Sequence, residues 1–241
     1  MQLSGLHHVT CVCANAQRTL DFYRGLGFLL VKKTVNFDDP HSYHLYFGDE
    51  SGTPGTLITF FEWPRADPGR VGRGTLASVG LVTPFVNDER EETDPDGLVL
   101  RLFPGDTVRL RDVEVIGNAD LYAGLVATDA PLRFAEPVEE PALIGPGTTH
   151  HIAWRVRDDD EQARWLGLLQ NVGLRPTTVQ DRKYFRSVYF RMPDGMLLEI
   201  ATDEPGFLVD EPRESLGQGL SLPPWLEPER GAIEAGLEPI A

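Results

Sequence analysis

The sequence predicts an α+β fold in which paired β-α-β-β-β modules curl a mixed sheet around a shared site. A pattern of strands and one helix occurs at residues 7–60 and again at 150–200, and each copy begins with two adjacent histidines. The copies keep one spacing, because His8 to Tyr46 and His151 to Tyr189 are both separations of 38 residues. We therefore divide the chain into a first module at 1–64, a reduced and mostly β central region at 65–146, a second module at 147–207, and a Pro-rich C-terminal tail with a short helix at 208–241.

Each module opens with a strand that leads through a polar turn into an amphipathic helix. The two matching segments are "LHHVTCVCANAQRTLDFYRGLGF" at 6–28 and "THHIAWRVRDDDEQARWLGLLQNVGL" at 149–174. A glycine stands near the end of each predicted helix, which is typical of a helix C-terminus.

Each module then closes with a strand, a turn rich in Pro and Gly, and a further strand. The matching segments are "YHLYFGDESGTPGTLITF" at 43–60 and "RSVYFRMPDGMLLEIA" at 186–201. Aligning "GTLIT" with "GMLLE" places Thr59 at the position that Glu199 holds in the second copy.

The central region reads as strands without a long amphipathic helix. Strands are predicted in "GTLASVGLV", "GLVLRLF" and "RDVEVIG", and a charged turn in "DEREETDPDG". In the tail, "LPPWLEPERGAIEAGL" has prolines near the expected start of a short helix.

Composition excludes several classes of partner. A net charge of −15 argues against nucleic acid and against an anionic membrane surface, since both require clustered Lys and Arg. No apolar run approaches the roughly 20 residues that span a bilayer, and the N-terminus lacks the pattern of a secretion signal. Cys11 and Cys13 are too close for an unstrained disulfide, so we expect a reducing, cytoplasmic setting.

Strand alternation selects three side chains for the enclosed face of the sheet. In each opening strand the second histidine, His8 or His151, points away from the helix of its own module. In "MLLEIAT", Glu199 falls on the enclosed face between apolar neighbours. A buried carboxylate is costly unless it is paired, protonated or bound to a metal.

Two histidines and one carboxylate form the ligand set of non-haem Fe(II) oxygenases, in which positions stay open for substrate and dioxygen. Zn(II) and Mn(II) accept the same residue types. Other interpretations remain open at this point: a histidine at a strand start is often capped or structural, and an interior glutamate often pairs with an arginine such as Arg155 or Arg182.

The chain resembles the vicinal oxygen chelate superfamily, and within it the hydroquinone-type ring-cleaving dioxygenases. The matching text is "GLHHVT", "DFYRGLGFLLVKKTVNFDDPHSYHLYFGDESGTPGTLITFF", "GTTHHIAWR", "DRKYFRSVYFRMPDG" and "LLEIATDEPGF", within residues 4–63 and 147–207. The resemblance implies an Fe(II) enzyme that opens the ring of a small hydroquinone or catechol with O2. It places the metal on His8, His151 and Glu199.

The resemblance also implies catalytic roles for His7, Thr10, His150, Arg182 and Tyr189. Alternation supports Thr10 and Tyr189, which share the enclosed face of their strands. It places His7 and His150 on the opposite side, where solvent-exposed strand starts are the alternative. His41 and His44 are expected to be structural or surface residues.

Relatives of this type usually carry four modules, so the central two are expected to be shortened here, and a homodimer would cover the exposed edges. Two other functions remain open. A glyoxalase-like isomerase or lyase would usually need a fourth acidic ligand, and Thr59 at that position counts against it. A metal-independent binding protein of the antibiotic-sequestering kind would not need all three ligands.

Overall fold

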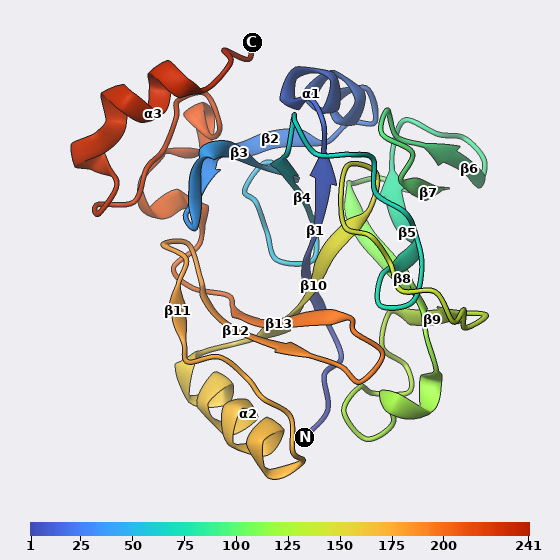
Figure 1. The fold of residues 1–241 in the computed structure, drawn as a ribbon. Helices are drawn as coiled ribbons and strands as arrows, with labels where there is room; N and C mark the ends of the chain where they lie inside the picture. The colour runs from blue at the N-terminus through green and yellow to red at the C-terminus, as the bar shows by residue number, and fades with distance from the viewer.

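Two sheets form the molecule in the computed structural model, which describes residues 1–241 (Figure 1). The larger has eight strands in the order β11-β12-β13-β10-β1-β4-β3-β2, and the smaller has five in the order β6-β7-β5-β8-β9. The larger sheet is strongly curled, with α1 and α2 at its opposite ends (Figure 1). The predicted α+β class and curled mixed sheet are confirmed.

Both predicted modules contribute to the eight-stranded sheet, and each has one helix and four strands. The first comprises β1 (Leu6–Cys13), α1 (Ala16–Gly25), β2 (Leu29–Asn36), β3 (Asp39–Gly48) and β4 (Leu57–Glu62); the second comprises β10 (Thr149–Val156), α2 (Asp159–Asn171), β11 (Gln180–Asp181), β12 (Arg186–Arg191) and β13 (Leu197–Thr202).

The two helices begin and end in the same way. Asn15 and Asp158 cap their N-termini, each accepting a hydrogen bond from the backbone N–H three residues later. Each helix ends before a glycine with positive φ, Gly27 at 86° and Gly173 at 82°. The paired backbone bonds that follow, such as Phe28 N–H to the Tyr23 carbonyl, form a Schellman motif in both copies.

The strand register confirms the internal repeat residue by residue. β1 pairs with β4 so that Thr10 lies beside Thr59, and β10 pairs with β13 so that Ala153 lies beside Glu199. Tyr46 and Tyr189 lie beside these same two positions, on β3 and β12. Thr59 therefore occupies the place in the first module that Glu199 occupies in the second. β1 and β10 meet antiparallel where the modules join.

The five-stranded sheet comes from the central region. Its strands are β5 (Leu76–Thr83), β6 (Arg90–Thr93), β7 (Val99–Pro104), β8 (Arg109–Ile116) and β9 (Leu132–Ala135), with a single 3-10 turn at Ala119–Leu121 between β8 and β9. The charged-turn prediction is wrong at β6, which pairs antiparallel with β7 at the sheet edge. A charged sequence can form an edge strand because its side chains remain in solvent. The apolar faces of both sheets meet in one core of 45 buried residues.

The C-terminal segment 207–241 runs along β2, with an isolated bridge between Lys33 and Leu220. It contains 3-10 turns at Phe207–Val209, Arg213–Ser215 and Glu227–Glu229, followed by the short helix α3 (Arg230–Gly236). Its anchor is Lys32, whose side chain is fully buried: the ammonium lies 2.7 Å from Asp210 and also contacts Glu211. Within the described chain, no helix is both long and apolar enough to cross a membrane.

Candidate metal centre

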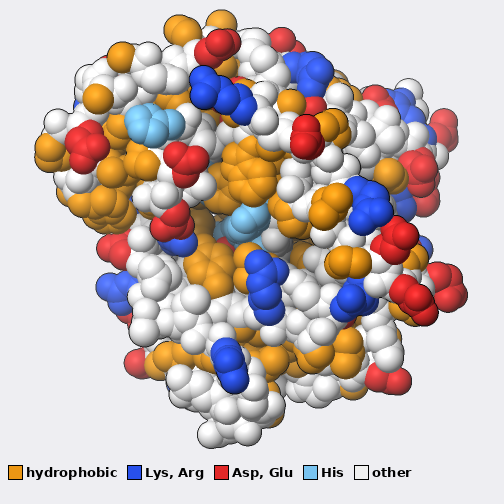
Figure 2. All heavy atoms as spheres, viewed as in Figure 1, with side chains coloured by type: hydrophobic (Ala, Val, Ile, Leu, Met, Phe, Trp, Pro, Cys, Tyr) orange, Lys and Arg blue, Asp and Glu red, His pale blue; other side chains and the backbone are white.

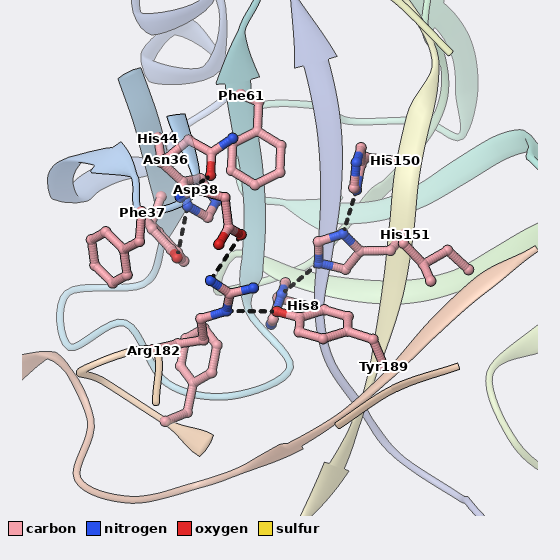
Figure 3. A pocket seen from close by; sticks show the side chains of 13 residues that line it. His8, Asn36, Phe37, Asp38, His44, Phe61, His150, His151, Arg182 and Tyr189 are labelled. Carbon is pink, nitrogen blue, oxygen red and sulfur yellow. Dashed lines mark hydrogen bonds and ion pairs between the residues drawn. The ribbon is translucent and has the colours of Figure 1, made fainter. Parts of the chain in front are cut away.

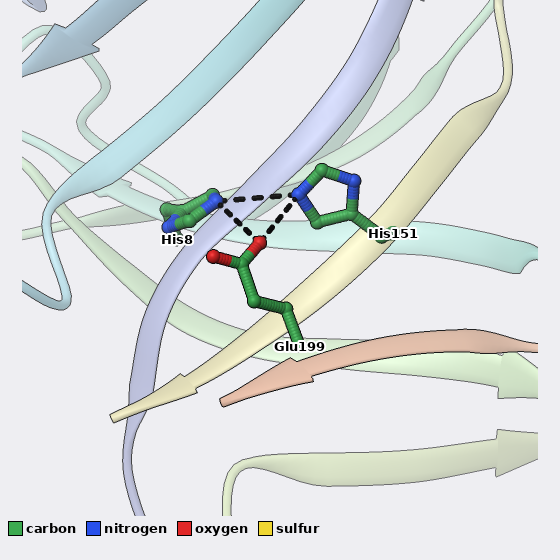
Figure 4. A group of neighbouring side chains, drawn as sticks. All are labelled: His8, His151 and Glu199. Carbon is green, nitrogen blue, oxygen red and sulfur yellow. Dashed lines mark hydrogen bonds and ion pairs between the residues drawn. The ribbon is translucent and has the colours of Figure 1, made fainter. Parts of the chain in front are cut away.

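Three buried side chains converge where the modules join (Figure 4). Glu199 Oε2 lies 2.9 Å from His151 Nε2 and 3.4 Å from His8 Nε2, and the two imidazole nitrogens are 3.3 Å apart. His8 comes from β1, His151 from β10 and Glu199 from β13. The structure thus brings together the three residues that strand alternation selected.

The three side chains fit a divalent metal. Glu199 Oε2 is buried and faces only the two imidazole nitrogens, with no other donor, whereas Oε1 accepts a hydrogen bond from the Ser187 hydroxyl. A buried carboxylate oxygen without a donor is costly, and a cation beside it would remove that cost. Burial alone would raise the pKa of Glu199, but the two imidazoles hold it well below the usual value, so the ligand is ionised. Burial also lowers the pKa of His151, which favours the neutral, ligating imidazole.

The His-His doublets orient the ligands. His7 Nδ1 lies 2.9 Å from His8 Nδ1, and His150 Nδ1 lies 2.8 Å from His151 Nδ1. Burial and the neighbouring histidine lower the pKa of both His7 and His150 to about 3, so both rings are neutral at pH 7 and have one accepting nitrogen. When each ligand keeps Nε2 for a metal, its Nδ1–H donates to the histidine before it, an arrangement that fixes tautomer and ring orientation.

The first histidine of each doublet is not a solvent-exposed strand start. His7 is 2% exposed and packs against Phe185, with ring centroids 5.0 Å apart. His150 is half-buried and lines the cavity described next. Strand alternation placed both side chains on the wrong side of the sheet. Their rings turn toward the following histidine, whose Nδ1–H needs an acceptor.

A cavity of about 280 Å³ opens over His8 and His151. Its volume is at the small end for ligand sites and is suited to a single substituted ring. Apolar walls are provided by Phe61, Phe185 and Leu197. Figure 2 shows a hollow in the middle of this face, with a histidine at its base and hydrophobic side chains around it.

Arg182 bridges the cavity rim and Tyr189 (Figure 3). Its Nε donates to the Tyr189 hydroxyl at 3.2 Å, and its Nη1 lies 3.0 Å from Asp38 Oδ2. Burial raises the pKa of Tyr189, so the phenol keeps its proton. Burial alone would lower the pKa of Arg182, but Tyr189 and Asp38 raise it above the ordinary value, so the guanidinium stays charged.

A hydrogen-bonded chain forms the opposite wall and includes a residue that sequence reasoning missed. His44 Nε2 lies 3.0 Å from the Thr59 hydroxyl, which is 2.8 Å from that of Thr10, and the Tyr46 hydroxyl lies 3.0 Å from His44 Nδ1. His44 lines the cavity, so its expected structural or surface role is corrected. The internal repeat offered a signal. His44 lies two residues before Tyr46, just as Ser187 lies two residues before Tyr189. His44 therefore occupies the position in the first module that Ser187, a partner of Glu199, occupies in the second.

Comparisons with known proteins agree with this geometry. The family model described as "Glyoxalase/Bleomycin resistance protein/Dioxygenase superfamily" matches residues 5–200. The chain belongs to this superfamily. Maize glyoxalase I shares the superfamily fold, with a TM-score of 0.60 at 13% identity over 83% of this chain and 92% of the other.

The more similar superfamily members are named as dioxygenases. The chain is 34% identical to "Putative ring-cleaving dioxygenase MhqA" of Bacillus subtilis, over the whole of both chains. It is 31% identical to the chlorohydroquinone/hydroquinone 1,2-dioxygenase of Sphingobium indicum, over 94% of this chain and 93% of the other. A crystal structure of a "putative dioxygenase" from Bacillus subtilis superposes with a TM-score of 0.93 at 32% identity, covering 100% and 98% of the two chains.

This superfamily member is shorter than those relatives. The alignment with MhqA has 316 positions against 241 residues here, so 75 positions of that relative have no counterpart in the chain. The ligand-bearing strands β1, β10 and β13 are all present.

The remaining sequence-predicted residues lie at different depths around the centre. His150, Arg182 and Tyr189 line the cavity, whereas His7 and Thr10 are buried behind it and contact His8 and Thr59. The family resemblance had assigned all five one kind of role, and the structure separates those that can meet a ligand directly from those that support a neighbour.

Proposed function

We propose that the chain is a metal-dependent dioxygenase that opens the ring of a hydroquinone- or catechol-type aromatic with O2. The observation that carries the proposal is the His8–His151–Glu199 group facing a small aromatic-walled cavity, with the neutral Thr59 at the fourth repeated position. Fe(II) is the metal that suits a two-histidine, one-carboxylate group in an oxygenase, while Mn(II) and Zn(II) accept the same ligands. The similarity to the Sphingobium enzyme supports a hydroquinone substrate.

When bound, Fe(II) supplies redox chemistry that couples the electron-rich ring to dioxygen. The chain's own residues bind and orient the ring. Phe61 and Phe185 contact its faces and exclude water, which strengthens every polar contact inside the cavity.

Proton handling falls to the groups beside the ligands. His150 is neutral and half-buried in the cavity wall, and its Nδ1 accepts from His151, so its Nε2–H can donate to an oxygen of the substrate. Tyr189 keeps its proton and accepts from Arg182, so its O–H is free to donate toward an oxygen of the substrate. Arg182 stays cationic and stabilises negative charge that develops nearby. The product is a ring-opened unsaturated acid.

The decisive experiment is an anaerobic titration of metal-free protein with Fe(II), Mn(II) and Zn(II), for wild type and Glu199→Ala. We expect one equivalent bound by wild type and lost in the variant, because removal of the carboxylate leaves two imidazoles. Glu140→Ala is the matched control, since Glu140 is 76% exposed and does not line the cavity.

Oxygen uptake on a panel of hydroquinones and catechols then identifies the reaction. A metal-replete, active Glu199→Ala protein contradicts the ligand assignment. Wild type that binds metal but consumes no oxygen with any diol contradicts the dioxygenase assignment, and isomerase activity on the same preparation would replace it. Wild type that binds no metal would support the metal-independent binding function instead.

A further inference from the structure

We propose that Asp38 is a specificity-determining residue that excludes anionic ring substituents from the cavity by neutralising its one cation, Arg182. The inference rests on the proposed function in taking the ligand to be a dihydroxylated aromatic ring. The uncharged substituents that remain compatible are hydrogen, alkyl, halogen and amide groups.

The charges that line the cavity carry the first step. Arg182 is the only lysine or arginine among its lining residues. The other polar side chains of the lining are amide, carboxyl, phenol and imidazole groups, and none of these carries a fixed positive charge. A carboxylate on an incoming ring would therefore meet one positively charged side chain in the cavity besides the metal site, and that side chain is Arg182.

The guanidinium of Arg182 is already paired with Asp38 and hydrogen-bonded to Tyr189. Arg182 Nη1 lies 3.0 Å from Asp38 Oδ2 and Nε donates to the Tyr189 hydroxyl, so two sides of the guanidinium are engaged. The guanidinium carbon also lies 5.2 Å from the centroid of the Tyr189 ring. Figure 3 shows Arg182 held between the two residues. The nearby Lys183 offers no substitute, because its ammonium contacts Asp210 and the Leu222 carbonyl.

Asp38 is held in place by its own turn. It lies in the turn between β2 and β3, and its backbone N–H donates to the side chain of Asn36 at 3.0 Å. Its side chain is 74% exposed, whereas that of Arg182 is 20% exposed, so the carboxylate sits at the rim and the cation reaches inward. A negative charge fixed at the mouth repels an anion both on entry and when bound.

Asp39 provides a matched control. It is the next residue of the same hairpin and carries the same charge, but it is absent from the cavity lining. Asp38→Asn and Asp39→Asn remove equal charge from adjacent positions, and only the first frees Arg182.

The test compares two ligands of nearly equal shape, 2,5-dihydroxybenzoate and the neutral 2,5-dihydroxybenzamide. Dissociation constants are measured by anaerobic calorimetry on metal-loaded and metal-free protein, and kcat/KM by oxygen uptake. We expect wild type to prefer the amide, and Asp38→Asn to bind the benzoate about three- to tenfold more tightly with the amide unchanged, a modest factor because Asp38 is exposed. The gain should shrink in 0.5 M salt, and Asp39→Asn should match wild type.

Three results would overturn the inference: wild type that binds both ligands equally, Asp38→Asn that shifts both ligands alike, or Asp39→Asn that reproduces the benzoate gain. The proposed function fails separately, when wild type consumes no oxygen with unsubstituted hydroquinone. The binding comparison still decides the role of Asp38 in that case, because it requires no turnover.

Discussion

A neutral imidazole that binds a metal through one nitrogen carries a proton on the other, and when buried this N–H needs a hydrogen-bond acceptor. In this molecule the partner is the preceding residue, since Nδ1 of His8 and of His151 lies within 2.9 Å of Nδ1 of His7 and of His150. A neutral histidine is a suitable acceptor only while it stays unprotonated, and burial ensures this. The adjacency of the two histidines therefore has a chemical reason.

The supporting histidines should control metal affinity without being ligands. His7→Phe and His150→Phe keep an aromatic ring but leave the Nδ1–H of the next residue without an acceptor. We expect the affinity for Fe(II) to fall about 10- to 100-fold in each variant, as for other supporting partners of metal ligands. Anaerobic titration measures this, with the exposed His41→Phe as control; wild-type affinity in both variants would contradict the role.

Tyr189 should affect turnover and leave the metal in place. Tyr189→Phe removes the hydroxyl that Arg182 orients while the ring still packs 5.7 Å from His151. We expect full metal occupancy and a kcat lowered about 100-fold, a typical loss for a positioned proton donor. Single-turnover oxygen uptake measures the step, and Tyr43→Phe, outside the cavity lining, is the control. Unchanged kcat would remove Tyr189 from the reaction.

At the scale of elements, the exit of α1 depends on a left-handed residue. Gly27 has φ of 86°, and a Cβ there would meet the Phe85 ring at 2.5 Å. Gly27→Ala should cost about 1–2 kcal/mol for the conformation alone, so Tm should fall by about 2–8 °C. Gly25→Ala is the control, because that position is helical and open and the change should raise Tm slightly. Equal Tm shifts would contradict the Schellman assignment.

Sequence patterns predicted those parts of the elements that depend on neighbours along the chain. Alternation along single strands was sufficient to select His8, His151 and Glu199, because their common face follows from parity. It could not place Asp38 beside Arg182, since that contact joins a hairpin of one module to a hairpin of the other. His44 was missed for the same reason, because its partner Thr59 lies on a neighbouring strand. β6 lacks apolar alternation and forms only because β7 offers an edge.

At the scale of the whole molecule, the tail is held to β2 by charge. Burial by itself would raise the pKa of Asp210, but Lys183 and Lys32 lower it below the ordinary value. A lowered folded pKa contributes stability that is present above the unfolded pKa near 4 and is lost as pH falls through the folded pKa. Asp210 therefore stabilises the fold at neutral pH and not in strong acid.

Asp210→Asn should accordingly lower stability at pH 7 by about 1–3 kcal/mol, because the fully buried Lys32 loses a charged partner. The difference from wild type should shrink as pH falls through the lowered folded-state pKa of Asp210, because the carboxyl is then protonated in both states. Urea unfolding at pH 7 and at a series of acidic pH values measures it, with the exposed Glu214→Gln as control. A difference that persists unchanged in acid would show that the loss is not electrostatic.

The homodimer expected from the sequence stays a prediction, which sedimentation at several concentrations would test.

The origin of the three ligands has a consequence for how the molecule is made. β1 supplies the first imidazole near the N-terminus, β10 supplies the second, and the carboxylate arrives only with β13. A nascent chain therefore holds only two of the three side chains of the candidate metal site until β13 has been synthesised. Any metal that needs all three must be captured after almost the entire polypeptide has emerged, so a product that ends before β13 lacks the complete site.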